Sequence, residues 1–347
     1  MLGIPHQDFT EPKVMVVGMA PLVIYGATGY TGRMASENAK SLNLDFMIAG
    51  RTEEKLMPFA SSLGVPYSVF DMKDPDLIDS TLKNASVLLN CAGPFMRTAI
   101  PLIEACLRNQ VHYLDLSAEL ESIQQTYKLD EDAKNAQVML LPGCGGSVAM
   151  LGCLADHAIQ SAKNPRQIDI ALHVAGTMSR GSAMSAAESM TGKCLQVIDG
   201  SFAAKDARET IILNFDDDNG DVTCFPVALP DLFTLQKSTN VRNIRTYVHA
   251  NDDSFPAGDL QSLPDGPTLT QRDASPYSAA IMITFEDKTV HNAVLHTVNG
   301  YTFTAMAAVQ AAKRVLDHQV KIGFQTPVQL FGREFIHCVS GSKTKDL

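Results

Sequence analysis

The chain has 347 residues, of which 45% are hydrophobic and 19% charged, with a formal net charge of −10. These values are typical of a globular protein with one large or two ordinary domains, and the acidic balance disfavours a nucleic-acid or anionic-membrane partner. The seven cysteines form no Cys-x-x-Cys pair, and we find neither a membrane-spanning stretch nor a signal peptide. We therefore expect a cytoplasmic protein.

From Pro21 to Gly143, short apolar runs alternate with stretches of helical periodicity. Strands that are apolar throughout are buried on both faces, and helices between them indicate parallel pairing. We therefore predict an α/β fold: a Rossmann-type, doubly wound parallel sheet over residues 21–162, after an N-terminal extension over residues 1–20. The predicted strands are Leu22–Gly26, Phe46–Gly50, Tyr67–Phe70, Ser86–Ala92, Val111–Leu116 and Val138–Leu141.

Beyond residue 163 the strands become longer and partly alternating. An acidic run, Asp216–Asp221, could hold calcium, but Asp-Asn-Gly between two strands is more often a hairpin turn. We predict an inserted α+β domain over residues 163–299 with a mostly antiparallel sheet. Residues 300–347, beginning with a helix over 300–319, are expected to return to the Rossmann domain. The predicted strands are Ile168–Ala175, Thr210–Asn214, Ser278–Phe285 and Val290–Thr297, the last two joined by a turn at Glu286–Lys288.

Three glycines in the segment GATGYTG, Gly26–Gly32, follow the first predicted strand directly and open a helical pattern. In a dinucleotide site, the first glycine makes the tight turn, the second lets the backbone approach the pyrophosphate, and the third lets the helix pack on the strand. The helix N-terminus then stabilises the phosphate charge. The spacing differs from G-x-G-x-x-G, so the strand–turn–helix context carries the prediction, and a turn without ligand is the alternative. The predicted cofactor-binding residues here are Gly26, Thr28, Gly29, Tyr30, Thr31 and Gly32.

The end of the second strand indicates which nicotinamide cofactor is bound. A site that prefers NAD places a carboxylate there for the ribose 2′-hydroxyl, whereas this strand ends in Arg51 and Thr52, and Asp45 comes too early. A guanidinium would hold a 2′-phosphate by charge-assisted hydrogen bonds. The alternative is a surface arginine at the start of the next helix. We therefore predict NADP(H) as the cofactor.

Several segments resemble the saccharopine dehydrogenase-like oxidoreductases, a family that includes saccharopine reductase and the trans-acting enoyl reductases. The resemblance implies a Rossmann domain interrupted by an α+β domain, with the loop after the fourth strand beside the nicotinamide. The resembling segments are Val23–Gly32, Ala49–Arg51, Leu88–Phe95, Ala105–Cys106, His112–Asp115, Ser179–Ser182, Asn299–Thr304 and Gly323–Pro327. The cofactor-binding residues predicted outside the glycine turn are Arg51, Thr52, Asp71, Cys91, Ala92, Gly93 and Pro94.

The chain departs from the family pattern on the expected substrate side. The loop Cys144–Gly152 lacks the usual acidic and proline residues, Ser117–Glu119 replaces a Gly-Glu ending, and Met96–Thr98 replaces Tyr-Gly. We therefore expect a substrate different from those of the best-known members. A loss of redox activity also stays open.

Side chains that follow the fourth to sixth strands should face the ligand, because ligands bind outside the carboxyl ends of such strands. Asp115 could stabilise an iminium cation or relay a proton, and Tyr113 could donate one. A local hydrogen bond for Asp115 and a core position for Tyr113 are the alternatives. The predicted substrate-binding residues are Phe95, Arg97, Ser147, Met150 and Ser182.

These observations together predict an NADPH-dependent enzyme that reduces a C=N or an activated C=C bond of a small, mostly apolar metabolite. No tyrosine has a lysine four residues later, which argues against a short-chain reductase, and no metal site is predicted because the histidines lack ligand spacing. The alternative is a non-redox enzyme or binding protein that retains NADP(H). A homodimer formed through the long strands of the second domain is also plausible.

Overall fold

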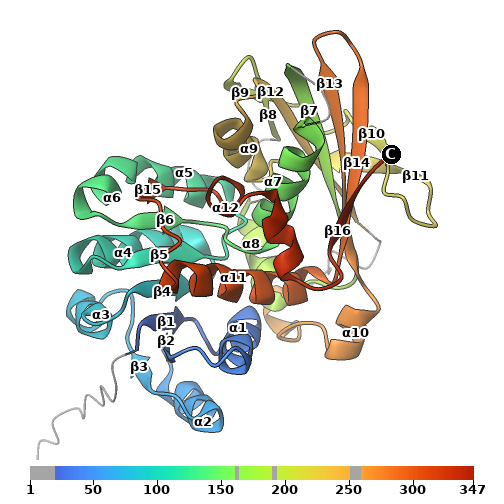
Figure 1. Ribbon diagram of the computed structural model, residues 1–347. Coiled ribbons are helices and arrows are strands. Elements are labelled where there is room, and N and C mark those ends of the chain that lie inside the picture. Colours follow the sequence, from blue (N-terminus) through green and yellow to red (C-terminus); the bar gives the residue numbers. More distant parts are fainter. Residues whose placement is uncertain (1–19, 161–163, 190–193, 251–258) are drawn as a thin grey trace, which may run out of the picture.

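The computed structural model describes residues 20–160, 164–189, 194–250 and 259–347. Two sheets lie beside each other, each with its own helices (Figure 1). Helix α7 (Gly146–Ile159) contacts strands of the second sheet as well as helix α11 (Gly300–Leu316). The predicted combination of a parallel Rossmann-type sheet and a second, mostly antiparallel sheet is confirmed.

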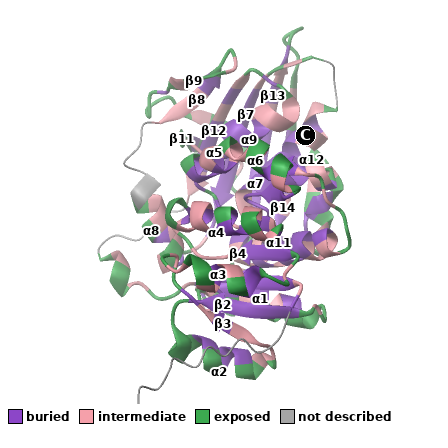
Figure 2. Ribbon diagram, turned by 90° about the vertical axis from the view of Figure 1, so that its left-hand side faces the viewer, coloured by how far each residue is buried: buried purple, intermediate pink, exposed green. Residues whose placement is uncertain are grey.

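The first sheet has seven described strands in the order β15-β6-β5-β4-β1-β2-β3, and all their pairings are parallel. Alternate residues of β1 enter two different cores: Leu22 and Ile24 one, Val23 and Tyr25 the other. Figure 2 shows β2 and β4 coloured as buried, while the neighbouring helices α2 and α3 carry exposed residues. The strands are β1 (Leu22–Tyr25), β2 (Phe46–Gly50), β3 (Tyr67–Val69), β4 (Val87–Asn90), β5 (His112–Asp115), β6 (Met139–Leu141) and β15 (Gly323–Phe324).

Helices cover both faces of this sheet, and their ends follow local signals. Asp74 caps α3 by accepting the N–H of Leu77, and Asn299 caps α11 by accepting the N–H of Tyr301. Helix α11 packs on α1 and reaches β4 and β5. Besides α7 and α11, the helices are α1 (Tyr30–Ser41), α2 (Glu53–Leu63), α3 (Pro75–Leu82), α4 (Phe95–Asn109), α5 (Leu120–Lys128), α6 (Asp130–Ala136), α12 (Pro327–Phe331) and the 3-10 helix η2 (Arg333–Cys338).

The second sheet runs in the order β10-β11-β12-β7-β13-β14-β16, with β8 and β9 attached to β12. Within the described part of this second sheet, β12 and β7 pair in parallel and the other pairings are antiparallel. The strands are β7 (Pro165–Val174), β8 (Leu195–Ile198), β9 (Ser201–Ala204), β10 (Ile211–Asn214), β11 (Asp221–Pro226), β12 (Asn243–Ala250), β13 (Tyr277–Phe285), β14 (Val290–Thr297) and β16 (Lys343–Asp346). Shorter helices accompany them: α8 (Arg180–Ser189), α9 (Asp231–Thr239), α10 (Leu269–Asp273) and η1 (Leu260–Ser262).

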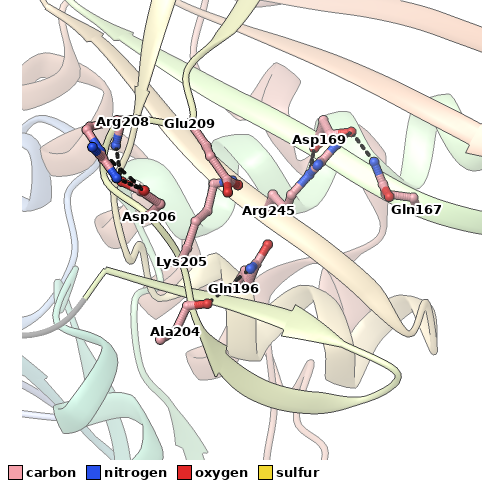
Figure 3. Close-up of polar contacts among 9 residues, drawn as sticks. All are labelled: Gln167, Asp169, Gln196, Ala204, Lys205, Asp206, Arg208, Glu209 and Arg245. Carbon is pink, nitrogen blue, oxygen red and sulfur yellow. Dashed lines mark hydrogen bonds and ion pairs between the residues drawn. The ribbon is translucent and has the colours of Figure 1, made fainter.

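The two faces of the second sheet differ in chemistry. The even-numbered residues of β7 from Ile168 to Val174 belong to the main core cluster, whereas Asp169 and Ala171 point to the other face. There the fully buried Asp169 accepts a hydrogen bond of 2.8 Å from Arg245, and the buried Lys205 pairs with Glu209 at 3.0 Å (Figure 3). Each buried charge on this outer face therefore has a partner.

The hairpin expected around Asp216–Asp221 joins β10 to β11, in agreement with the turn reading of that acidic run. The expected return of residues 300–347 to the Rossmann domain needs one correction. Helix α11 and strand β15 do return, but β16 pairs with β14 of the second sheet. This pairing covers the edge of β14, which would otherwise be exposed, and Asp346 accepts hydrogen bonds of 3.0 Å from His157 and His291.

Candidate active site

A cavity of about 990 Å³ lies between the carboxyl ends of the first sheet and the inner face of the second. Its size suits a ligand-binding site of the usual range. Its walls come from the glycine turn, the starts of α2 and α7, the loops after β4 and β5, helices α8 and α11, and strands β7, β11 and β12. Ligands of doubly wound sheets bind at this edge, where the strand order reverses between β1 and β4.

The glycine turn is shaped by close backbone contacts. Gly26 has a φ of +77°, and a Cβ there would lie 2.8 Å from the backbone nitrogen of Ala92. A Cβ on Gly32 would lie 2.2 Å from the carbonyl oxygen of Gly26, so Gly32 lets α1 pack against the turn without itself lining the cavity. Gly29 begins α1 without a side-chain cap, which leaves the helix N-terminus available to a phosphate. Of the predicted turn residues, Gly26, Thr28, Gly29, Tyr30 and Thr31 line the cavity.

Arg51 and Thr52 line the cavity beyond the end of β2, as the sequence predicted for a 2′-phosphate. The structure adds Lys55, in the first turn of α2, to the same wall. Glu53, on the same turn, instead accepts a hydrogen bond of 3.2 Å from Tyr67. Two cations, Arg51 and Lys55, therefore border this end of the cavity. The sequence did not predict Lys55 as a site residue, because its position depends on where helix α2 starts.

Tyr30 connects the glycine turn to the second domain. Its ring packs edge-on against Tyr301 at 5.2 Å, and its hydroxyl donates to the carbonyl of Pro267 and accepts from Arg272. Burial raises the pKa of Tyr30 above its ordinary value. The residue predicted to touch the cofactor therefore also fixes the two domains against each other.

The loop after β4 is held by a small polar network. The side-chain oxygen of Asn90 accepts the N–H of Ala92 at 2.9 Å, and Thr98 donates to the carbonyl of Ala92 at 2.6 Å. Cys91, Ala92, Gly93 and Phe95 line the cavity, whereas Pro94 does not. The Gly93–Pro94 peptide bond is cis.

Asp115 and Tyr113, the predicted catalytic residues, do not line the cavity. Both are fully buried, and the Asp115 carboxylate accepts hydrogen bonds from the backbone of Ser117 and Gly143 at 2.8 Å and from the Tyr113 hydroxyl at 2.9 Å. Burial raises the pKa of Asp115 to about 6 and that of Tyr113 well above its ordinary value. This geometry corrects their predicted role: they support the loops that follow β5 and β6.

Two further predicted residues lie outside the cavity. Phe95 is buried and faces the cavity, so Arg97, two residues later on α4, is turned about 200° away and is exposed. The carboxylate of Asp71 accepts the N–H of Lys73 at 3.0 Å in a local turn. Neither residue lines the cavity.

Glu119 is a cavity residue that the sequence analysis noted only as part of an altered family signature. Its carboxylate accepts the first two N–H groups of α4, from Phe95 and Met96, and the hydroxyl of Ser185 on α8, each at 3.0 Å. The residue is buried, with 6% of its surface exposed. Glu119 therefore joins the loop after β4 to a helix of the second domain.

The remaining wall is mostly apolar. Ser147 and Met150 on α7 and Ser182 on α8 line the cavity as predicted. Most of the altered segment Cys144–Gly152, expected to be a loop, belongs to α7, and packing constrains its start, because a Cβ on Gly145 would lie 2.6 Å from the carbonyl oxygen of Thr304. We call the outer part of the cavity the apolar arm; its residues are Leu172, Val174, Met178, Met184, Ala186, Pro226, Val227, Ala228, Leu229 and Val248.

Comparison with known proteins agrees with this geometry. Residues 22–141 match the family model described as the saccharopine dehydrogenase NADP binding domain. This part of the chain is similar to the NADP-binding domains of saccharopine dehydrogenases. The resemblance seen in the sequence is thereby confirmed, and NADP(H) is its cofactor: the close-packed Gly26 turn, the uncapped α1 N-terminus and the Arg51–Lys55 cations fit that group.

The similarity to curated relatives extends over only part of this chain and only part of each relative. The bovine saccharopine dehydrogenase-like oxidoreductase is 31% identical over 144 residues, 36% of this chain and 34% of that protein. The trans-acting enoyl reductase of Mycobacterium leprae is 31% identical over 134 residues, 36% of this chain and 32% of that protein. The chain thus matches about a third of the length of these relatives.

The whole fold also has a solved counterpart. Saccharopine dehydrogenase (L-Glu forming) from Saccharomyces cerevisiae superposes with a TM-score of 0.67 at 12% identity, over 94% of this chain and 100% of that chain. At this identity the match shows a shared fold. Within the described ranges, no helix has the length and apolar character needed to cross a membrane, and no three potential metal ligands come together.

Proposed function

We propose that the protein is an NADPH-dependent oxidoreductase that reduces a C=N bond, or an activated C=C bond, of a small and mostly apolar molecule. The observation that carries this proposal is the continuity of the cavity. It runs from the Arg51 end, past the glycine turn and the Cys91–Phe95 loop, into the apolar arm. A cofactor and an apolar substrate can therefore meet beside the loop after β4.

NADPH, when bound, supplies a hydride for such a reduction. The residues of this chain position the reactants and exclude water. The glycine turn and the α1 N-terminus hold the phosphates, while the Cys91–Phe95 loop, anchored by Asn90 and Thr98, shapes the reacting end. Strands β7, β11 and β12 of the second sheet form a wall of this end, and exclusion of water by a bound substrate would strengthen electrostatic interactions inside the cavity.

A C=N bond is the first choice of substrate group. A protonated imine already carries the proton that its reduction requires, so it needs no strong general acid. This agrees with the positions of Asp115 and Tyr113 away from the cavity. Reduction of a C=C bond is the second choice, supported by the similarity to the trans-acting enoyl reductase of Mycobacterium leprae.

We also propose a cytoplasmic location, supported by seven cysteines that are all free. A homodimer stays a prediction. The β10–β11 hairpin packs on the outer face of the second sheet. Strand β10 is at the edge of the strand order, and its Ile212 is 66% exposed. We therefore expect β10 of one copy to pair with β10 of a second copy. Sedimentation of the purified protein measures its oligomeric state.

Calorimetric titration followed by an absorbance assay tests the proposed function. We expect NADPH to bind more tightly than NADH, and NADPH absorbance to fall when an apolar cyclic imine is added, with a slower or absent response to an enone. Tight NADPH binding without consumption by any imine or enone would favour a non-redox protein that retains NADP(H). If neither NADPH nor NADH binds, the proposed function is contradicted.

A further inference from the structure

Glu119 is a carboxylate in the cavity wall with only neutral partners. Two backbone N–H groups and one hydroxyl donate to it. A carboxylate has about four lone-pair positions for hydrogen bonds, so one position stays open. Because the residue lines the cavity, that position is available to a ligand.

The cations of the cavity lie elsewhere. Arg51 and Lys55 border the phosphate end, beyond β2, whereas Glu119 follows β5, on the other side of β1 and β4. Arg180 pairs with Asp265, which is 76% exposed. Within the described ranges, no Lys, Arg or His forms an ion pair with Glu119. The substrate end of the cavity therefore carries an unbalanced negative charge.

The N-terminus of α4 is the main opposing influence, because its first two N–H groups donate to Glu119 and a helix N-terminus carries about half of a positive charge. The start of α7 also lines the cavity, at Gly145 and Gly146. Both are partial charges of backbone dipoles, and neither supplies a cationic side chain to the carboxylate. An unpaired charge in a mostly apolar wall is costly unless a counter-ion joins it.

We propose that the cavity binds a lipophilic amine or iminium cation whose nitrogen donates to Glu119 and whose hydrocarbon body lies in the apolar arm. This cation-binding proposal deepens the proposed function. It rests on that function only because it takes this cavity as the substrate site. Leu172, Val174 and Val248 supply the surface for the hydrocarbon body. Phe225, which pairs with Val248 across β11 and β12 and is 57% exposed, extends that surface beyond the cavity.

Three probes of equal chain length test the proposal: n-octylammonium, n-octanol and n-octanoate, titrated by calorimetry into the full-length protein saturated with NADPH. We expect octylammonium to bind most tightly. Glu119→Gln should lower its affinity by roughly 10- to 100-fold, as expected for a hydrogen bond to a charged group, and change the octanol affinity by no more than about twofold. Glu121→Gln is the matched control, because Glu121 is exposed in the first turn of α5, two residues after Glu119, and does not line the cavity.

Ser185→Ala provides a second variant in case Glu119→Gln does not fold. It frees a lone pair of Glu119 and leaves the carboxylate in place, so octylammonium should bind equally well or more tightly. The proposal is overturned if octanoate binds most tightly, or if Glu119→Gln weakens octanol and octylammonium alike. It is also overturned if Glu119→Gln weakens only NADP⁺ binding, because the carboxylate would then serve the oxidised nicotinamide.

The test separates this proposal from the proposed function because the probes are not reduced. Octylammonium binding that depends on Glu119, without turnover of any imine, would support the cation site and count against the reductase. Imine reduction with a KM unaffected by Glu119→Gln would support the reductase and overturn the cation site.

Discussion

The two ends of the cavity are built in different ways. The phosphate end depends on a single strand–turn–helix unit and the end of the next strand, Gly26–Gly32 and Arg51–Lys55. The substrate end is assembled from segments far apart in the sequence: Glu119 contacts Ser185, 66 residues later, and Leu172 lies on the same wall as Val248. The first end therefore follows from local sequence, whereas the second exists only once both sheets are in place.

Replacing Asp115 should have the largest effect, and on stability rather than on chemistry. Asp115→Ala leaves two backbone N–H groups and the Tyr113 hydroxyl without their buried partner. We expect the free energy of unfolding to fall by about 3–5 kcal/mol, measured by denaturant unfolding. Asp71→Ala, which removes an exposed carboxylate, should cost under about 1 kcal/mol.

The pH dependence gives a further check on Asp115. Its folded-state pKa, raised by burial to about 6, lies above its ordinary value of 3.8. The stabilisation that protonation of this carboxyl gives to the folded state is therefore fully present below about pH 4 and is lost as the pH rises through about 6. Asp115→Asn should flatten this slope. A folded Asp115→Asn protein that had lost turnover by more than about a thousandfold would restore the direct catalytic role.

Gly26→Ala tests the phosphate end. The added Cβ would press on the backbone of Ala92, and the φ of +77° strains any L side chain. We expect NADPH affinity to fall by at least about 100-fold in calorimetry. Gly64→Ala is the control, because Gly64 has a φ of +65° but open space around it, so it should lower stability slightly and leave NADPH affinity unchanged. Equal effects of the two variants on affinity would contradict the role of the turn.

Arg51→Ala should lower NADPH affinity by roughly 10- to 50-fold and leave NADH affinity nearly unchanged, because only NADPH carries the 2′-phosphate. Lys55→Ala should act in the same direction and less strongly, since a single ammonium lacks the paired donors of a guanidinium. The affinity of the wild-type protein for NADPH should also fall with added salt. An equal loss for both nucleotides would show that Arg51 supports the fold instead.

The smallest effect concerns Asp231 at the start of α9, beside the apolar arm. Among the described residues, no other group donates a hydrogen bond to its carboxylate oxygens, and burial raises its pKa to about 7. Its contribution to stability is lost as the pH rises through about 7. Asp231→Asn should therefore stabilise the protein by about 1–2 kcal/mol at pH 8 and change little at pH 4, in thermal unfolding. Destabilisation at pH 8 would indicate a partner for the carboxylate.

Local patterns predicted the first sheet closely because its strands are apolar throughout; β2 has the predicted bounds. Strand β12 was not predicted, since Arg245 interrupts its apolar residues and is matched only by Asp169, 76 residues earlier. Strand β16 was not predicted either, because a charged tail forms a strand only against the edge of β14. At the site, Gly26 and Arg51 were predicted because local sequence determines their positions. The role of Glu119 was not predicted because it depends on Ser185, which lies far away in the sequence.

Transfer of deuterium from labelled NADPH tests the central claim most directly. The full-length protein would be incubated with NADPH carrying deuterium at the reactive carbon of the nicotinamide and an apolar cyclic imine, and the amine product would be analysed by mass spectrometry. We expect one deuterium in the product, bound to the former imine carbon. A product without deuterium, or an unchanged imine in the presence of tightly bound NADPH, would contradict hydride transfer in this cavity.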